Sequence, residues 1–261
     1  TRRQRQMCIR DRLITNDDGI TSNGIRALAE VMQNFGKVVV VAPDKPQSAM
    51  GHAITITKPL RLTKVDVFGT DIEAYACSGT PVDCVKLAGD KVLDRKPDLC
   101  VSGINHGPNS SINVIYSGTM SAAMEASMEG IHAVGFSLLN FSSNADMSHA
   151  KRVVKDIIEN LLYKGMATCN LLNVNIPDIP YEDIKGIKIC RQGEAHWKEA
   201  YDERIDPVGR KYYWLTGKFT VTDQGEDTDV WALENGYVSV VPTQHDLTAY
   251  KDVEFLKEKW K

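Results

Sequence analysis

One short run limits the fold of this chain more than any other: residues 37–41 read Lys-Val-Val-Val-Val. Four consecutive β-branched residues are typical of a strand buried on both faces, because successive side chains point to opposite faces of a sheet. Upstream, helical spacing relates Ile25, Leu28, Ala29 and Met32, with Ser22 or Asn23 as a candidate N-cap and Gly36 just beyond the end. A short apolar strand at 13–15 precedes this helix, so the chain opens as β-α-β and predicts a parallel sheet.

The same alternation of strand and helix continues to about residue 176. Apolar runs at 99–102, 133–139 and 171–174 predict three more buried strands. Helical patterns lie at 120–129, where Gly130 supplies a stop, and at 153–162, where Asp146 is the candidate cap. We therefore expect an α/β protein with a Rossmann-like, doubly wound and mostly parallel sheet.

The two ends of the chain have a different character. Residues 1–12 are basic and lack the apolar stretch of a signal peptide, so we interpret them as a non-native or disordered extension. The core is expected at 13–200. In the remaining part, 201–261, the aromatic and β-branched runs at 211–214 and 237–241 predict hairpins in a C-terminal extension that packs back on the core.

Charge and cysteine content exclude some classes of partner. Among the 261 residues, 31 Lys and Arg face 34 Asp and Glu, and a net charge of -3 gives no field for binding a nucleic acid polymer. No apolar run reaches the roughly 18 residues that cross a bilayer, so no membrane partner is expected. The six cysteines form no Cys-x-x-Cys pair, which favours reduced thiols and a cytoplasmic location.

Oxygen-bearing side chains follow the carboxyl ends of several predicted strands, where open α/β sheets bind their ligands. These residues are Asp17, Asp18, Ser48 and Asn105. Two carboxylates, a hydroxyl and an amide oxygen form a hard donor set that suits Mg²⁺ or Mn²⁺. The alternative is an ordinary Asp-Asp-Gly turn closed by the side chain of Asn16 or Asp17.

Two further segments are candidates for binding phosphate. Ser117, Gly118 and Thr119 open the small-residue helix at 120–129, and the free N–H groups of a helix start attract anions. The alternative is plain N-capping by Ser117 or Thr119. In the loop at 105–111, Asn109 offers an amide donor, and His106 is either structural or a donor to phosphate and acid for the leaving group.

Other catalytic motifs are missing from the sequence. There is no Gly-x-Ser-x-Gly elbow for a serine nucleophile and no Gly-x-x-x-x-Gly-Lys-Ser/Thr loop for a nucleoside triphosphate. Gly-x-Gly-x-x-Gly, the dinucleotide-binding pattern, is also missing.

Taken together, these stretches resemble the SurE (survival protein E) nucleotidase family. The matching segments are 15–20 (Thr-Asn-Asp-Asp-Gly-Ile), 42–43 with 47–48, 78–84 (Ser-Gly-Thr-Pro-Val-Asp-Cys), 102–107 (Ser-Gly-Ile-Asn-His-Gly), Asn109, 116–119 (Tyr-Ser-Gly-Thr), 206–214, 228–229, 236–240 and 246–248. They run in family order from about residue 13 to the C-terminus. One departure is that charged Arg10, Asp11 and Arg12 precede the first strand, which in the family is apolar, so either the upstream stretch is foreign or the strand is frayed.

The resemblance implies a divalent-metal-dependent phosphatase of nucleoside 5′-monophosphates that also accepts 3′-nucleotides and short polyphosphate. It implies one Mg²⁺ or Mn²⁺ ion per subunit on Asp17, Asp18, Ser48 and Asn105, and a C-terminal extension exchanged between the subunits of a homodimer, or a homotetramer. Water would be the nucleophile, oriented by Asp17 or Asp18. The rivals are a glycosyltransferase using a metal-held nucleotide sugar and a non-catalytic nucleotide sensor, which release of free phosphate from AMP would separate from a nucleotidase.

Overall fold

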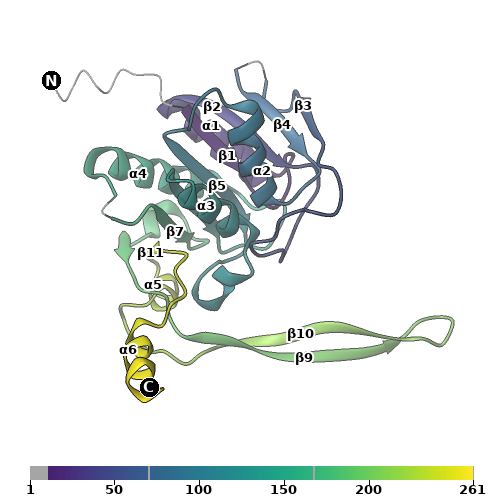
Figure 1. Ribbon diagram of the computed structural model, residues 1–261, viewed down its shortest axis with the longest axis vertical. Helices are drawn as coiled ribbons and strands as arrows, with labels where there is room; N and C mark the ends of the chain where they lie inside the picture. Colours follow the sequence, from purple (N-terminus) through teal and green to yellow (C-terminus); the bar gives the residue numbers. More distant parts are fainter. Residues whose placement is uncertain (1–10, 70, 167, 261) are drawn as a thin grey trace.

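The valine run forms part of a nine-stranded sheet in the computed structural model, which describes residues 11–69, 71–166 and 168–260 (Figure 1). Residues 1–10 of the predicted N-terminal extension lie outside this range. The strands of the sheet are β1 (Asp11–Thr15), β2 (Lys37–Pro43), β3 (Leu62–Val65), β4 (Glu73–Cys77), β5 (Leu99–His106), β6 (His132–Leu138), β7 (Leu171–Ile176), β8 (Ile187–Ile189) and β11 (Val238–Thr243). Their spatial order is β3-β4-β2-β1-β5-β6-β7-β11-β8.

Parallel pairing dominates this sheet, as the alternating sequence pattern predicts. Strands β4, β2, β1, β5, β6 and β7 are successively parallel, and only β3 against β4 and β11 against β7 are antiparallel. The prediction of a doubly wound, mostly parallel α/β fold is therefore confirmed.

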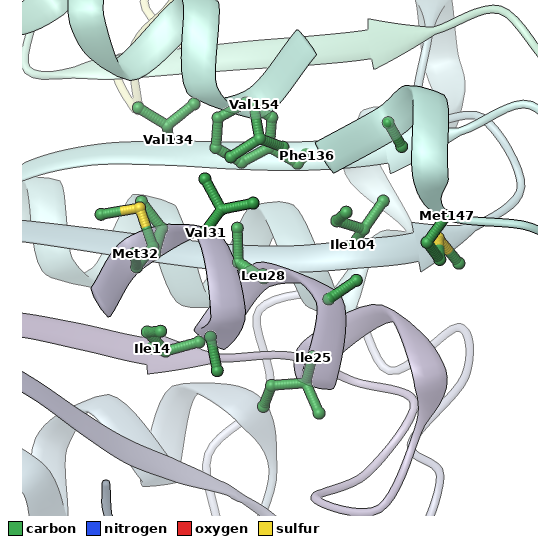
Figure 2. Packing of buried hydrophobic residues seen from close by; sticks show 14 of the residues in the cluster. Ile14, Ile25, Leu28, Val31, Met32, Ile104, Val134, Phe136, Met147 and Val154 are labelled. Carbon is green, nitrogen blue, oxygen red and sulfur yellow. The ribbon is translucent and has the colours of Figure 1, made fainter. Parts of the chain in front are cut away.

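Helices cover both faces of the sheet. The α-helices of the described residues are α1 (Asn23–Met32), α2 (Pro81–Leu87), α3 (Gly118–Met128), α4 (Ser148–Lys164), α5 (Asp229–Glu234) and α6 (Tyr250–Lys259). Helices α1 and α4 pack against one face, where Ile14, Leu28 and Phe136 belong to one large buried cluster (Figure 2). Helices α2 and α3 cover the other face around a second cluster. None of the described helices is long and apolar enough to cross a membrane.

Close packing of α1 against β5 fixes the helix that follows the Asp-Asp turn. A Cβ atom on Gly24 would lie 1.9 Å from the carbonyl oxygen of Ile104, so only glycine allows the observed contact. The hydroxyl of Ser22 accepts a hydrogen bond from the Ile25 N–H and so provides the predicted N-cap. Helix α1 therefore begins at a fixed place beside the end of β5.

The charged residues before the apolar part of β1 belong to the strand. Pairing with β2 begins at Asp11 and pairing with β5 begins at Arg12, so this strand is not frayed. The Asp11 carboxylate lies 2.8 Å from Arg95, and the buried Arg12 guanidinium donates to the Phe35 carbonyl at 3.2 Å. Both charges lie at the amino end of β1, away from the carboxyl edge where the candidate ligands lie.

Two predictions about local structure are wrong. The run at 237–241 does not form a hairpin: it lies in β11, which enters the main sheet between β7 and β8 because its alternate valines fill the core there. Asp146 does not cap α4, whose N-cap is Met147; its carboxylate instead accepts hydrogen bonds from the N–H and hydroxyl of Ser148.

The other predicted hairpin is present. Strands β9 (Ala195–Ile205) and β10 (Lys211–Val221) pair along their whole length, and the run at 211–214 lies in β10. This ribbon extends far from the layered body (Figure 1). The sequence analysis did not predict β3, β4 or α2, although residues 78–84 at the start of α2 are part of the family pattern.

Candidate functional site

The candidate ligands lie where the chain reverses its direction of travel across the sheet. From β1 the chain moves to β2 on one side, and it later returns to β5 on the other side of β1. A crevice forms at the carboxyl ends of strands at such a switch point. Asp17 and Asp18 lie two and three residues beyond the end of β1, whereas Asn105 and His106 are the last residues of β5 rather than part of a loop.

The turn after β1 is closed by Asn16. Its Nδ2 donates to the Gly19 carbonyl at 3.0 Å and to the Ser22 hydroxyl at 2.8 Å. Gly19 has a φ of 93° and lies against the backbone of Lys45, where a Cβ atom would come within 3.3 Å. The turn interpretation is therefore correct for Asn16, and it leaves both aspartate side chains for another role.

The side chain of Asp17 is buried and lies against the start of α3. Its Oδ1 accepts a 2.5 Å hydrogen bond from the Thr119 hydroxyl, and a Cβ atom on Gly118 would lie 2.9 Å from its Oδ2. Burial and then the charge of Asp18 raise the pKa of Asp17 to about 6, while hydrogen bonds from Thr119 act in the opposite direction. The helix start thus stabilises an ionised group that its surroundings otherwise disfavour.

Asp18 faces the end of β5. Its Oδ2 accepts a hydrogen bond from the His106 N–H at 3.3 Å, and burial raises the pKa of this carboxyl. The Asn105 Nδ2 donates to the Gly107 carbonyl at 2.7 Å, which leaves its Oδ1 for a ligand. Burial lowers the pKa of His106, although the Ser142 backbone and the Asp17 charge oppose the shift. The lowered pKa favours the neutral imidazole, which suits donation to a ligand better than acid catalysis.

Ser48 lies in the loop that follows β2. The Gln47 N–H donates to the Asp17 carbonyl at 2.8 Å, and the Ile20 N–H donates to Pro43 at 2.9 Å. These bonds join the loop to the turn after β1. Ser48 is exposed and directly follows Gln47, and its role as a metal ligand stays a prediction.

The three residues of the predicted phosphate cradle differ in their contacts. The Ser117 hydroxyl accepts from the Met120 N–H at 3.0 Å and is the N-cap of α3. Thr119 donates its hydroxyl to Asp17, as described above. Gly118 brings the helix start against that carboxylate, so the two hydroxyls serve the helix and the aspartate, and their role toward phosphate stays a prediction.

Asn109 lies in a buried polar network that the sequence analysis did not identify. Its Nδ2 donates to Ser137 at 2.8 Å, its N–H donates to Asn175 at 2.7 Å, and its carbonyl accepts from Asn173 at 2.8 Å. None of these contacts joins it to the two aspartates. The signal was present: the two asparagines alternate in an otherwise apolar strand, where buried polar side chains need partners.

These side chains fit a hard divalent cation. Within residues 11–69, 71–166 and 168–260, no three His, Cys, Asp or Glu side chains gather as a metal site. The predicted ligand set, however, has only two carboxylates, those of Asp17 and Asp18. Its other two donors are the hydroxyl of Ser48 and the amide oxygen of Asn105. A cation would offset the burial that raises the pKa of both aspartates and the charge of Asp18 that raises the pKa of Asp17 further, so the donors match Mg²⁺ or Mn²⁺ in chemistry.

A cavity of about 370 Å³ opens beside Asp18 and His106. The loop after β2 contributes residues 44–46 to its wall, and Ser143 and Asn144 close another side. Its walls are polar, and its size admits a small ligand rather than a polymer.

Comparison with known proteins agrees with this geometry. The family model "Survival protein SurE" matches residues 12–199. The chain belongs to the SurE family. A protein of Flavobacterium johnsoniae named 5′-nucleotidase SurE is 61% identical over 95% of this chain and 96% of its own length. A protein of Bacteroides thetaiotaomicron with the same name is 45% identical over 94% of this chain and 93% of its own length.

A solved SurE structure shares the fold. The crystal structure of the SurE protein from Aquifex aeolicus superposes with a TM-score of 0.83 and is 43% identical. The match covers 96% of this chain and all of that one. The Rossmann-like arrangement inferred from the strand pattern is thus that of a SurE family member.

The contact between Thr119 and Asp17 predicts a specific effect on metal affinity. Thr119→Val keeps the shape of the side chain but removes the hydroxyl, so we expect the pKa of Asp17 to rise further and Mn²⁺ to bind about tenfold more weakly at pH 7. Electron paramagnetic resonance of free Mn²⁺ measures this. Ser121→Ala is the matched control, because the Ser121 hydroxyl lies in α3 but bonds only to the Ser117 carbonyl. Equal Mn²⁺ affinities for the two variants would contradict the role given to Thr119.

Proposed function

We propose that this protein is a divalent-metal-dependent phosphatase that releases phosphate from nucleoside 5′-monophosphates. Relatives named 5′-nucleotidase SurE, which match nearly the whole chain, support this activity. They favour a nucleotidase over the glycosyltransferase and the nucleotide sensor that the residues alone leave open.

One observation in the structure carries the proposal. The side chain of Asn16 closes the turn after β1, so the two adjacent carboxylates of Asp17 and Asp18 at the switch point are not needed for that purpose. One of them, Asp17, is bonded instead to the start of a helix. Buried acidic pairs of this kind are costly unless a cation or a proton compensates them. A phosphomonoester that arrives with a divalent ion supplies both the compensating charge and an anion for the nearby N–H donors.

Each residue then has a role that follows from its place. Asp17, Asp18, Ser48 and Asn105 would hold one divalent ion, which when bound supplies Lewis-acid stabilisation of negative charge on the phosphoryl group. Asp17 or Asp18 would accept a hydrogen bond from the attacking water, orient it and take one proton from it as its oxygen bonds to phosphorus. His106, Asn109 and the start of α3 at Ser117, Gly118 and Thr119 donate hydrogen bonds to phosphate oxygens and so oppose the charge that develops there.

The finer assignments belong to the same proposal. We propose Mg²⁺ or Mn²⁺ as the ion, one per subunit, and 3′-nucleotides and short polyphosphate as additional substrates. Phosphate release from AMP, 3′-AMP and a short polyphosphate, each with Mg²⁺, Mn²⁺ or chelator, tests these assignments. Binding without turnover would favour the sensor.

Removing one ligand charge tests the site itself. Asp17→Asn and Asp18→Asn should each lower kcat/KM for AMP by at least about a hundredfold, because the developing phosphoryl charge loses its stabilisation. Both variants should keep the circular dichroism spectrum of the unmodified protein, since neither side chain fills the apolar core. Asp94→Asn, at an exposed position away from the site, is the control. Normal turnover of either site variant at limiting metal would rule out that residue as a ligand.

We propose that residues 201–261 join subunits into a homodimer or homotetramer, with an element exchanged between the subunits. This part of the chain lies beyond the match to the family model. The β9–β10 ribbon buries almost none of its own side chains, and Tyr212, Trp214 and Leu215 are exposed. An isolated two-stranded ribbon is marginally stable in water, so a partner surface would stabilise it.

Light scattering can test this assembly. The unmodified chain should have at least twice the monomer mass at micromolar concentration, and the double variant Tyr212→Glu, Trp214→Glu should shift toward monomer because charge replaces apolar contact area. Tyr163→Glu, at an exposed position of α4, should leave the mass unchanged. A chain cut near residue 200 is unsuitable because it would remove β11 from the main sheet. A monomeric unmodified protein would refute the assembly.

A cytoplasmic location is also proposed. The described cysteines at positions 77, 84, 100, 169 and 190 are all free thiols, and most are buried. Free thiols persist in a reducing compartment.

A further inference from the structure

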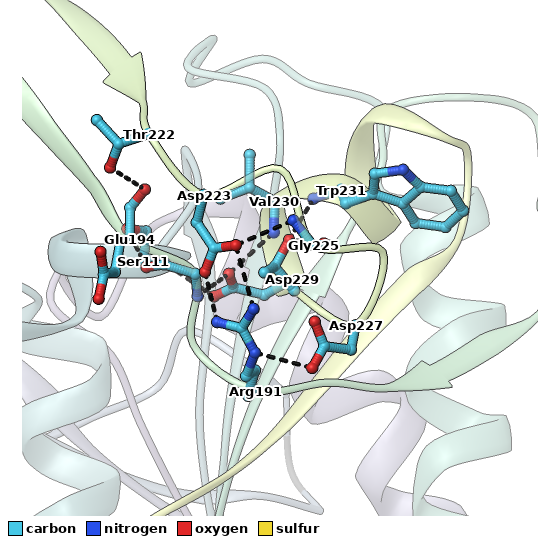
Figure 3. Close-up of polar contacts among 12 residues, drawn as sticks. Ser111, Arg191, Glu194, Thr222, Asp223, Gly225, Asp227, Asp229, Val230 and Trp231 are labelled. Carbon is cyan, nitrogen blue, oxygen red and sulfur yellow. Dashed lines mark hydrogen bonds and ion pairs between the residues drawn. The ribbon is translucent and has the colours of Figure 1, made fainter.

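A buried carboxylate far along the sequence holds the segment that carries Asn109. Asp229, at the start of α5, is 1% exposed and accepts three backbone hydrogen bonds. Its Oδ2 takes the Ser111 N–H at 2.8 Å, and its Oδ1 takes the N–H groups of Gly193 at 2.8 Å and Val230 at 2.9 Å (Figure 3). One side chain therefore joins the loop after β5, the approach to β9 and the start of α5.

The Ser111 backbone depends on this support. Its φ of 53° is in the left-handed region, which is unfavourable for a residue with a side chain. The Ser111 hydroxyl also donates to the Gly193 carbonyl at 2.7 Å. Ser111 is thus bonded to the base of the β9–β10 ribbon both directly and through Asp229.

A second set of contacts fixes Asn109 from the side of the sheet. Asn175 accepts the Asn109 N–H and Asn173 donates to its carbonyl, so both polar groups of this residue's main chain are bonded to side chains of β7. Asn175 in turn donates to Asn173 at 3.0 Å. The segment 109–111 is therefore held between β7 on one side and Asp229 on the other.

Burying a carboxylate costs desolvation free energy, which hydrogen bonds to the charged group can offset. Burial raises the pKa of Asp229, and the three N–H donors act against that shift. A neutral side chain could fill the same space at lower desolvation cost. What the carboxylate adds is two acceptor atoms in fixed positions, which hold two separate backbone segments together.

We propose that Asp229 is a positioning residue for phosphate binding: it fixes the segment 109–111, and with it Asn109, by joining this segment to the base of the β9–β10 ribbon. The inference rests on the proposed function in one respect, the role of Asn109 as a phosphate donor. It makes the C-terminal part of the chain necessary for substrate binding, although its residues stay outside the reacting groups.

The neighbouring acidic residues provide a matched control. Asp227 lies two positions away and bonds to the Arg191 Nε at 2.8 Å in the same cluster (Figure 3). Within the part of the chain that the structure describes, its side chain bonds to Arg191 and not to the segment 109–111, and it is exposed. Asp227→Asn therefore makes the same chemical change in the same cluster without touching the proposed link.

Inorganic phosphate is the probe for the test. Calorimetric titration of Mn²⁺-saturated protein should give a phosphate dissociation constant raised by at least about fivefold in Asp229→Asn, because an amide can no longer accept from both Ser111 and Gly193. The KM for AMP should rise with it. Mn²⁺ affinity should not change, since Asp229 does not contact the metal ligands, and Asp227→Asn should match the unmodified protein in all three quantities.

Ser111→Ala keeps the test open if Asp229→Asn does not fold. It removes only the bond to the Gly193 carbonyl and should weaken phosphate binding in the same direction by a smaller factor. If both variants melt at a lower temperature but bind phosphate normally, Asp229 is merely structural and the inference is overturned. If the unmodified protein binds phosphate but does not hydrolyse AMP, the proposed function fails while this inference stands.

Discussion

The hydrogen bond from Thr119 to Asp17 joins the two parts of the chain on which the site depends. Asp17 lies just beyond the carboxyl end of β1, and Thr119 lies in the first turn of α3 on one face of the sheet. Burial and the neighbouring Asp18 favour a proton on this carboxyl, whereas the helix start favours its charge. A pKa near 6 reflects that balance, and a divalent cation would shift it decisively toward the ionised form.

The sheet makes this balance possible because it decides which residues meet. Parallel strands β1 and β5 lie side by side. Asp18, just beyond the end of β1, and His106, the last residue of β5, therefore come into contact although 88 positions separate them. The apolar core below the edge resists rearrangement, and Gly24 and Gly118 let backbone approach backbone or carboxylate closely. Near the carboxyl edge of the sheet, polar contacts replace apolar ones. Asn173 and Asn175 bond to the main chain of Asn109, and Asp229 bonds to the main chain of Ser111. Hydrogen bonds are directional, so they fix these positions more closely than apolar packing does.

The sequence predicted the layers well because their signals are local. A run of valines and a helical repeat identify β2 and α1 without knowledge of their neighbours. The same rule failed at 237–241, because a strand in a hairpin and a strand inserted between β7 and β8 have the same alternation. Asp17, Asp18 and Asn105 were visible as candidate ligands because they are polar residues near the carboxyl ends of predicted strands. The partners of Asn109 and Asp17 were not, because Asn175 and Thr119 are brought near them only by the fold.

The most direct test of this account is a crystal structure of the protein with Mn²⁺ and inorganic phosphate, using the anomalous signal of manganese. The account predicts one peak per subunit at about 2.0–2.3 Å from oxygens of Asp17, Asp18 and Asn105, with Ser48 beside it and phosphate density between the ion and the start of α3. A peak elsewhere, or phosphate bound without an ion between these carboxylates, would contradict it.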